Sequence, residues 1–210
     1  SDEKKNREGR KTLEKDLKAL ESMKVDVVFL PAHTELYGQS FSFAVSENSL
    51  STKLEGAARP QFFNGVCTVV LKLFNIVKPN QTFFGQKDIQ QLMIIQKMTL
   101  DLNLNIEVIG CKTIREKNGL AMSSRNQYLN NEEKCLAANI YLFLQESKKM
   151  ILKKAKYSDV VKSFNKNIKR VGIMKVDYIS VACINTFDEL NDNVDLSKKD
   201  VVISCAIFLN

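Results

Sequence analysis

A short run of polar residues suited to anion binding occupies positions 85–91, Gly-Gln-Lys-Asp-Ile-Gln-Gln. A glycine between a strand and a helix leaves backbone N–H groups and the positive helix end facing an anion. Lys87 adds a mobile positive charge, Asp88 is suited to cap the helix or bind a ligand group, and Gln91 lies one turn beyond Lys87. In an open α/β sheet, this position is the crevice in which ligands bind. A turn of this composition also occurs for purely structural reasons.

Hydroxyl and guanidinium groups gather in a second segment, residues 119–126, Gly-Leu-Ala-Met-Ser-Ser-Arg-Asn. The short donors Ser123 and Ser124 and the bidentate donor Arg125 suit phosphate oxygens. A serine turn before a helix is the structural alternative. The chain has no Walker glycine loop, which argues against a P-loop enzyme.

The two segments together predict a triphosphate clamp between two domains, made by Gly85, Lys87, Ser123, Ser124 and Arg125. Nucleotidyl transfer needs positioning and positive charge on the phosphate oxygens, usually with Mg²⁺. The clamp supplies the positive charge and the hydroxyl donors, so it fits nucleotidyl transfer.

The elements that must position these segments follow from periodicity. Helices are predicted over 11–23, 66–77, 89–100, 131–150 and 158–170, strands over 25–30, 41–45, 82–84, 105–109, 176–181 and 201–208, and loops over 54–65 and 115–126. Alternating helices and strands up to residue 109 imply a parallel sheet with helices on its faces. We therefore expect an α/β fold, with a partial Rossmann-like domain over 1–112 and a smaller C-terminal α+β lid domain over 113–210. The expected core of the sheet domain is Val27, Phe29, Val66, Val70, Leu73, Phe83, Leu92, Ile95, Ile106 and Val108.

Composition excludes several classes of site. The single histidine, His33, which we expect in a loop, excludes a two-His metal site, and no metal ligands are predicted. Five cysteines without a C-x-x-C pair argue against a disulfide framework or a zinc site and predict buried free thiols in a reducing cytoplasm. No apolar run approaches the roughly 18 residues of a membrane span.

The excess positive charge is local: residues 146–170 contain nine Lys or Arg and two acids, and the whole chain carries +7. A basic patch is one mark of nucleic-acid binding. However, Tyr157, Val160, Val161, Phe164 and Ile168 fall at helical spacing, which predicts a buried stripe and lysines on the solvated face. We expect no nucleic-acid partner.

Four stretches resemble the pantothenate synthetase (pantoate–β-alanine ligase) family: residues 59–60, 65–73, 84–91 and 115–129. Their order and spacing match over nearly the whole chain. The resemblance implies a nucleotidyltransferase-type Rossmann fold and a cytoplasmic homodimer. It also implies that ATP and pantoate form pantoyl adenylate and pyrophosphate, after which β-alanine gives pantothenate and AMP.

The resemblance also implies roles for individual residues. Catalytic roles fall to Lys87, Ser123, Ser124 and Arg125, and ATP contacts to Gly85, Gln86, Lys87, Asp88, Ile114 (through its backbone), Met122, Ser123, Ser124 and Arg125. Substrate contacts fall to Gln91 and Arg59, and to Val66, Val69 and Val70 around the dimethyl group of pantoate.

The chain departs from the family in several places, of which two bear most on catalysis. The N-terminal Pro-Thr-Met-Gly-x-Leu-His-x-Gly-His segment has no counterpart, and Arg-Pro-Gly-His-Phe reads Arg59-Pro60-Gln61-Phe62-Phe63. We interpret the sequence as an internal piece of a longer enzyme. The alternative is a decayed, non-catalytic nucleotide- or pantoate-binding paralogue, which Phe62 favours because truncation does not explain it.

Overall fold

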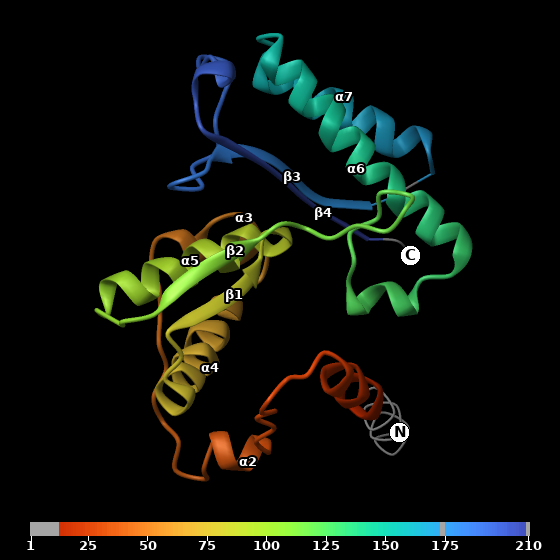
Figure 1. Cartoon of the computed structure of the whole chain (residues 1–210). Helices are drawn as coiled ribbons and strands as arrows, with labels where there is room; N and C mark the ends of the chain where they lie inside the picture. The colour runs from red at the N-terminus through yellow and green to blue at the C-terminus, as the bar shows by residue number, and fades with distance from the viewer. Residues whose placement is uncertain (1–12, 173–174, 209–210) are drawn as a thin grey trace. The chain divides into compact units, whose positions relative to one another are not determined.

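The structure, a computed structural model, describes residues 13–172 and 175–208 (Figure 1). The chain divides into two compact units, Ser1–Phe43 and Ala44–Asn210. The predicted α/β class is confirmed by a partial parallel sheet with helices and a C-terminal part of two helices and two antiparallel strands.

The described part of the first unit contains a helix over 13–22 and one helical turn, α2 (His33–Leu36), but no strand. The predicted strands at 25–30 and 41–45 are therefore wrong, and His33 is helical rather than in a loop. The side chain of Val27 is 80% exposed and Phe29 is also exposed, so neither is in the core. An extended segment becomes a strand only where a neighbour takes its backbone hydrogen bonds, and no described strand pairs with these residues.

The second unit begins with the helical segments η1 (Leu50–Thr52), α3 (Leu54–Ala58) and α4 (Phe62–Val77). The loop predicted over 54–65 is therefore wrong, because it contains α3 and the first turn of α4. Gly56 explains part of this difference: a Cβ atom there would lie 1.8 Å from the Ser51 carbonyl oxygen, so only glycine allows the approach.

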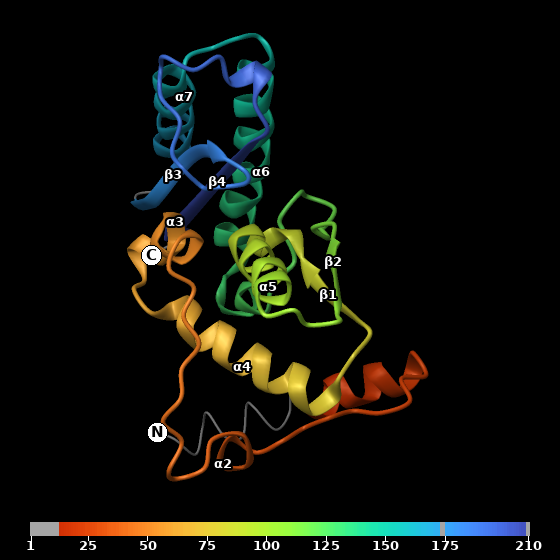
Figure 2. The same cartoon turned by 90° about the vertical axis from the view of Figure 1, so that its left-hand side faces the viewer.

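A parallel pair follows, made of β1 (Gln81–Gly85) and β2 (Glu107–Cys111), with η2 (Gln86–Asp88) and α5 (Ile89–Asp101) between them. Helix α5 packs on both strands and against α4 (Figure 2). Phe84 points into the core, whereas Phe83 points to the opposite face and is 63% exposed, so the expectation that Phe83 is buried is wrong. The buried core on this side consists of Leu50, Phe63, Cys67, Phe74, Ile94, Ile95, Met98 and Phe187.

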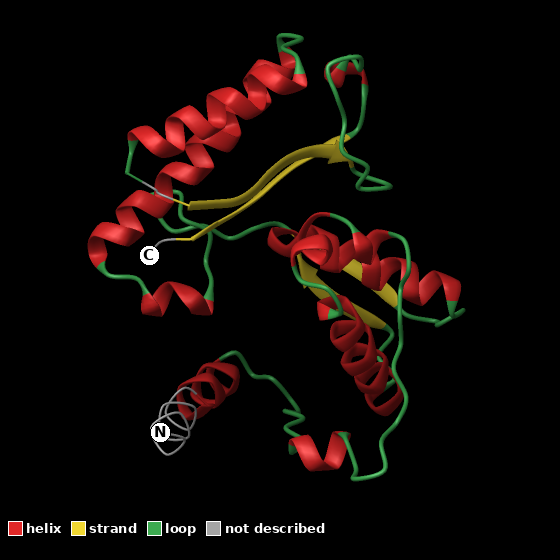
Figure 3. Cartoon of the chain, turned by 180° about the vertical axis from the view of Figure 1, so that it is seen from behind, coloured by secondary structure: helices red, strands yellow, loops and turns green. Residues whose placement is uncertain are grey.

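The remainder of the second unit contains η3 (Ser124–Tyr128), α6 (Asn131–Leu152), α7 (Tyr157–Arg170), β3 (Lys175–Cys183), η4 (Leu196–Lys198) and β4 (Val201–Phe208). Asn130 and Glu133 cap α6 reciprocally, which starts the helix where the sequence predicts it. Helix α7 returns alongside α6, and both cover one face of the antiparallel β3–β4 pair (Figure 3).

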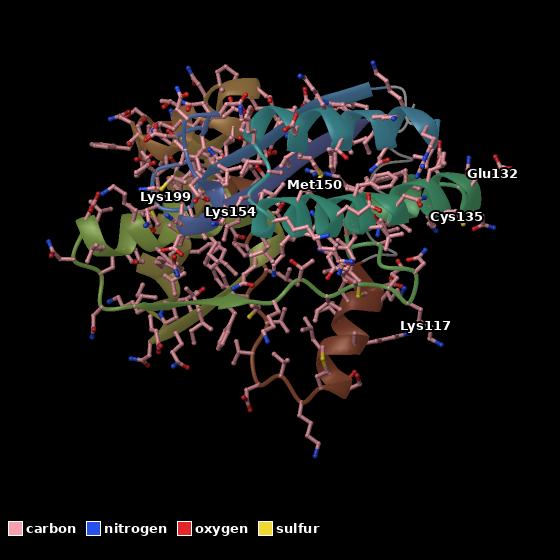
Figure 4. The ribbon with its side chains drawn as sticks, turned by 90° about the horizontal axis from the view of Figure 1, so that it is seen from above. Lys117, Glu132, Cys135, Met150, Lys154 and Lys199 are labelled. Carbon is pink, nitrogen blue, oxygen red and sulfur yellow. The ribbon has the colours of Figure 1, made fainter. Side chains whose placement is uncertain are left out.

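The predicted stripe on α7 is confirmed: Val160, Phe164 and Ile168 are buried, and all nine basic residues of 146–170 are exposed. The cysteine prediction is half right, because all five thiols are free but only Cys67 is buried; Cys111 and Cys135 are exposed. Figure 4 shows Cys135 beside Glu132 near the start of α6, with Lys154 and Lys199 towards the opposite end of the helix. No described helix is long and apolar enough to cross a membrane.

Within the second unit, Phe187 connects the parts on either side of the predicted domain boundary. It follows β3 but is 1% exposed within the core formed by α4 and α5. The division at residues 112 and 113 stays a prediction.

Candidate functional site

The carboxyl ends of β1 and β2 form the centre of the candidate site. Gly85 pairs with Cys111, so both strands end at the same edge of the parallel pair. Residues 85–88 leave one strand there, and the chain towards Ile114 leaves the other. This is the edge at which open α/β sheets bind ligands.

Gly85 keeps this edge open. Its backbone is extended, and a Cβ atom built on it meets nothing within 4 Å. A larger residue would project into the space above the strand end, whereas glycine leaves it available to a ligand.

Lys87 and Asp88 lie at the entry to α5. The Lys87 Nζ atom is 3.4 Å from Asp88 Oδ1, and their side chains are 34% and 55% exposed. Asp88 makes no side-chain hydrogen bond to the helix, so the expectation that it can act as a cap is not met. Both groups are reachable from solvent, and neither is buried in a structural ion pair.

Two adjacent glutamines on α5 behave differently. Gln91 is half-buried, and no hydrogen bond joins its side chain to the described residues. Gln90 is 5% exposed, and its amide nitrogen donates to the carbonyl oxygens of Leu50 and Lys53, at 2.7 Å each. Its amide oxygen accepts from the Glu55 N–H at 3.1 Å. Gln90 therefore fixes the start of α3, a role that sequence reasoning missed because neighbouring glutamines look alike in a motif.

The three valines of α4 that are predicted to line an apolar pocket do not all pack against the same cluster. Val66 and Val70 are half-buried against the core, whereas Val69 is half-buried outside that cluster. The pocket for a dimethyl group stays a prediction.

Arg59 follows α3 and interacts with two carboxylates. Its Nη1 atom hydrogen-bonds Glu55 Oε1 one helical turn earlier, and its Nη2 atom is 3.9 Å from Asp177 Oδ2 on β3. The side chain is 42% exposed. Arg59 thus connects the sheet side of the unit to the C-terminal strands.

Phe62 stands where the resemblance expects histidine. It opens α4 with its side chain 40% exposed, and its ring centroid lies 5.1 Å from that of buried Phe63. The preceding Gln61 adopts a left-handed conformation with φ of 67°. An aromatic hydrocarbon at position 62 provides no titratable group.

The second predicted segment forms a tight turn held against α6. Arg115 and Ala121 form an antiparallel bridge, and the Arg115 side chain donates to the Gly119 carbonyl at 3.2 Å. The Arg115 guanidinium stacks 3.6 Å above the Tyr141 ring. Gly119 has φ of 93°, which a side-chain-bearing residue rarely adopts. These contacts make the turn a defined platform rather than a loose loop.

The candidate ATP-contacting residues sit on the flanks of this turn. Ile114 and Met122 are 65% and 57% exposed, and the Ile114 carbonyl accepts from the Met122 N–H at 2.9 Å. The Ser123 hydroxyl accepts from the Arg125 N–H at 3.3 Å and so caps η3, which agrees with the serine turn considered as the structural alternative. Ser124 and Arg125 have exposed side chains.

The structure brings residues 85–88 to the strand edge from which the chain leads to Ile114. No hydrogen bond or ion pair within residues 13–172 and 175–208 joins Lys87 to Ser123, Ser124 or Arg125. The triphosphate clamp therefore stays a prediction. Gln86, the remaining residue of the set, is exposed and packs its side chain over Gly110 at the same edge.

A groove of about 500 Å³ lies elsewhere, between α6 and the start of β4. Leu144, Lys148, Ser197 and Val202 are among its lining residues, and no predicted site residue lines it. Among the described residues, no group of three His, Cys, Asp or Glu side chains is arranged to hold a metal ion.

A protein-family model described as pantoate-beta-alanine ligase matches residues 5–210. The pantothenate synthetase of Thermosipho africanus is 43% identical over 198 residues, covering 94% of this chain and 69% of that protein. The pantothenate synthetase of Ruminiclostridium cellulolyticum is 40% identical over 198 residues, with the same coverage of 94% and 69%.

Solved structures agree. The crystal structure of pantothenate synthetase from Thermus thermophilus superposes with a TM-score of 0.81 at 35% identity, covering 86% of this chain and 66% of that one. Pantoate-beta-alanine ligase from Francisella tularensis, complexed with beta-gamma ATP and beta-alanine, gives 0.69 at 28% identity, covering 93% and 69%. The chain spans about two thirds of the length of these relatives.

Proposed function

The chain belongs to the pantoate–β-alanine ligase family, and on that premise we propose that it serves the ATP-dependent condensation of pantoate with β-alanine. In the first step a pantoate carboxylate oxygen bonds to the α-phosphorus of ATP and pyrophosphate leaves. In the second step the β-alanine ammonium loses a proton, its nitrogen bonds to the pantoyl carbonyl carbon, AMP leaves, and the nitrogen loses a second proton. The product is pantothenate.

The observation that carries this proposal is the open edge at Gly85, where Lys87 and Asp88 are reachable from solvent. A positive charge next to a helix N-terminus favours bound phosphate. Gln86 packs over the same edge. We assign this segment to ATP, with Lys87 neutralising charge on the phosphate oxygens.

The turn that packs against α6 supplies the second group of ATP contacts. We assign it the Ile114 backbone, Met122, Ser123, Ser124 and Arg125. The Arg115–Tyr141 stack supports this assignment, because catalysis by charge stabilisation needs donors held in place before the reaction.

Substrate contacts fall to the elements beside this edge. Gln91 has an amide without a partner among the described residues, which leaves it available to the polar groups of pantoate. Val66, Val69 and Val70 on α4 offer apolar surface to the dimethyl group. Arg59 offers a guanidinium to a substrate carboxylate.

Mg²⁺ fits this site as part of the substrate. Magnesium is commonly held by one or two carboxylates together with phosphate oxygens rather than by a protein cage. The described residues form no such cage, and Asp88 supplies one exposed carboxylate beside Lys87. We therefore propose MgATP as the substrate form.

The test is to incubate the chain with MgATP, pantoate and β-alanine and to measure AMP and pyrophosphate. We expect pantoate-dependent pyrophosphate and β-alanine-dependent AMP, both reduced at least 100-fold by Arg125→Ala, in line with the loss of one charge-stabilising donor. Arg170→Ala, at the exposed end of α7, is the matched control and should leave both rates unchanged. Saturable ATP binding without AMP would instead favour a non-catalytic binder, and AMP formation without pantoate would contradict the reaction.

Two further properties complete the proposal. We propose a homodimer, which the resemblance supports, and a cytoplasmic location, with which the five free thiols agree. We also retain the division into residues 1–112 and 113–210. Sedimentation of the purified chain tests the oligomeric state.

A further inference from the structure

A β-bulge in β3 turns a carboxylate towards Arg59. Val176 pairs with Ile207 and Tyr178 with Ala206, so Asp177 is the extra residue between them. Bulges break the alternation of a strand, redirect a side chain and are frequent beside active sites. Here the redirected carboxylate lies 3.9 Å from the Arg59 Nη2 atom.

The resulting cluster contains two carboxylates and one guanidinium. Glu55 hydrogen-bonds one edge of Arg59, while the separation from Asp177 exceeds a normal N–H···O hydrogen bond. Arginine has five N–H donors, so the edge facing Asp177 retains unused donors. The side chains of Glu55 and Asp177 are each 26% exposed and Arg59 is 42% exposed, so a small ligand can reach the cluster.

Hydroxyl groups extend the cluster along the same strands. Tyr178, Ser180 and Ser204 share the face of β3–β4 opposite α6 and α7, because Ile179 and Cys205 pack against those helices. Ser180 is 3% exposed, and its Oγ atom has no hydrogen-bond partner among the described residues. Buried hydroxyls without partners are rare in native proteins and indicate a place where a ligand or water completes the bonding.

Tyr178 links these hydroxyls to the charged cluster. The pKa of Tyr178 is raised to about 12, chiefly by burial and then by the Glu55 carboxylate, while the Ser204 hydroxyl and Arg59 oppose the rise. Tyr178 is therefore neutral at physiological pH and lies within the electrostatic influence of both Glu55 and Arg59. A neutral phenol adds a hydrogen-bond donor to the site.

We propose that Glu55, Arg59 and Asp177 recognise a small amino acid, with Arg59 binding its carboxylate and the two acidic side chains binding its ammonium group. The cluster carries a net charge of −1, so it disfavours a plain carboxylate and favours a zwitterion. The inference rests on the proposed function, in which β-alanine is the zwitterionic substrate and pantoate is a plain carboxylate. Asp177 is then a specificity-determining residue, contributed by the C-terminal strands.

The test compares β-alanine with propionate, which has the same carbon chain but no ammonium group. Both ligands are titrated calorimetrically into the chain in the presence of a non-hydrolysable ATP analogue. Asp177→Asn should weaken β-alanine binding about tenfold, because one charged contact to the ammonium is lost, and should leave propionate binding unchanged or tighter. Asp101→Asn, in the separate Lys97–Asp101 pair of α5, is the matched control and should change neither affinity.

Asp177→Glu retains the carboxylate and should restore β-alanine affinity to within about threefold of the wild type, which separates a charge effect from misfolding. The inference is overturned if Asp177→Asn weakens both ligands equally, since that marks only structural support. It is also overturned if neither affinity changes, or if the wild type binds the ATP analogue and pantoate but not β-alanine. If the wild type binds neither the ATP analogue nor pantoate, the proposed function itself fails and the inference falls with it.

Discussion

Replacing Gln90 by leucine should separate a structural glutamine from a ligand-binding one. Leucine keeps the approximate size of the side chain but has no amide. Three backbone groups then lose one hydrogen bond each: the carbonyls of Leu50 and Lys53 and the N–H of Glu55. The two carbonyls still accept from backbone N–H groups, Leu50 from Lys53 at 3.3 Å and Lys53 from Gly56 at 2.8 Å.

The magnitude follows from the burial of each group. The bond to Leu50 is fully buried, and the loss of one buried hydrogen bond costs about 1–1.5 kcal/mol. The other two bonds are half-buried, so water replaces part of them, and each loss costs about 0.5–1 kcal/mol. The expected loss is about 3 kcal/mol of unfolding free energy, which lowers the urea midpoint by about 1–2 M.

The assay is urea unfolding followed by circular dichroism, with Gln91→Leu as the matched control. Gln91 makes no hydrogen bond to the described residues, so its replacement should change stability by less than about 0.5 kcal/mol while abolishing measurable pantoate binding. Equal stability losses in the two variants would refute the reasoning. So would a Gln90→Leu protein as stable as the wild type.

Three further outcomes are expected, each measurable by unfolding experiments. Gly119→Ala should cost about 1–2 kcal/mol because φ is 93°, whereas Gly65→Ala, helical and with open space around its Cβ position, should stabilise by up to about 1 kcal/mol. Gln61→Gly should stabilise by about 0.5–1 kcal/mol by relieving the left-handed backbone, and Gln61→Ala should have little effect because alanine has the same strain. Burial raises the pKa of Cys67 from 9.0 to about 11, so the folded state keeps the thiol proton up to a higher pH than the unfolded state does. The free energy of unfolding should therefore fall by roughly 2–3 kcal/mol between pH 9 and 11. A Cys67→Ala protein with the same alkaline slope would contradict that assignment.

The sequence predicts elements well wherever a pattern is local. The helices α5, α6 and α7 and the strand β4 lie close to their expected positions, because apolar spacing and the Asn130 and Glu133 cap are visible in the sequence. The segment at 25–30 is an apolar, valine-rich run typical of a strand but is not one, because a strand also needs a partner, which composition does not reveal. Phe83 shows a similar limit: period 2 identifies two faces but not which one is covered.

In the candidate site too, local features can be predicted from the sequence and long-range contacts cannot. Lys87 and Asp88 can be placed from the sequence because a strand, a glycine and a helix follow one another. The contact between Arg59 and Asp177 joins residues far apart in the chain and depends on a β-bulge, for which the sequence has no glycine marker. Gln90 and Gln91 are chemically identical, and only the position of Leu50 and Lys53 over one of them makes it structural.

The measurement that tests the central claim most directly is ATP binding by the purified chain, with and without Lys87. Calorimetric titration with MgATP should show saturable binding that weakens at least tenfold in Lys87→Ala, since the charge facing the phosphates is lost. Lys97→Ala, which removes a lysine paired with Asp101 on α5, should bind ATP like the wild type. No saturable ATP binding by the wild type, or equal affinities in the wild type and Lys87→Ala, would contradict the account.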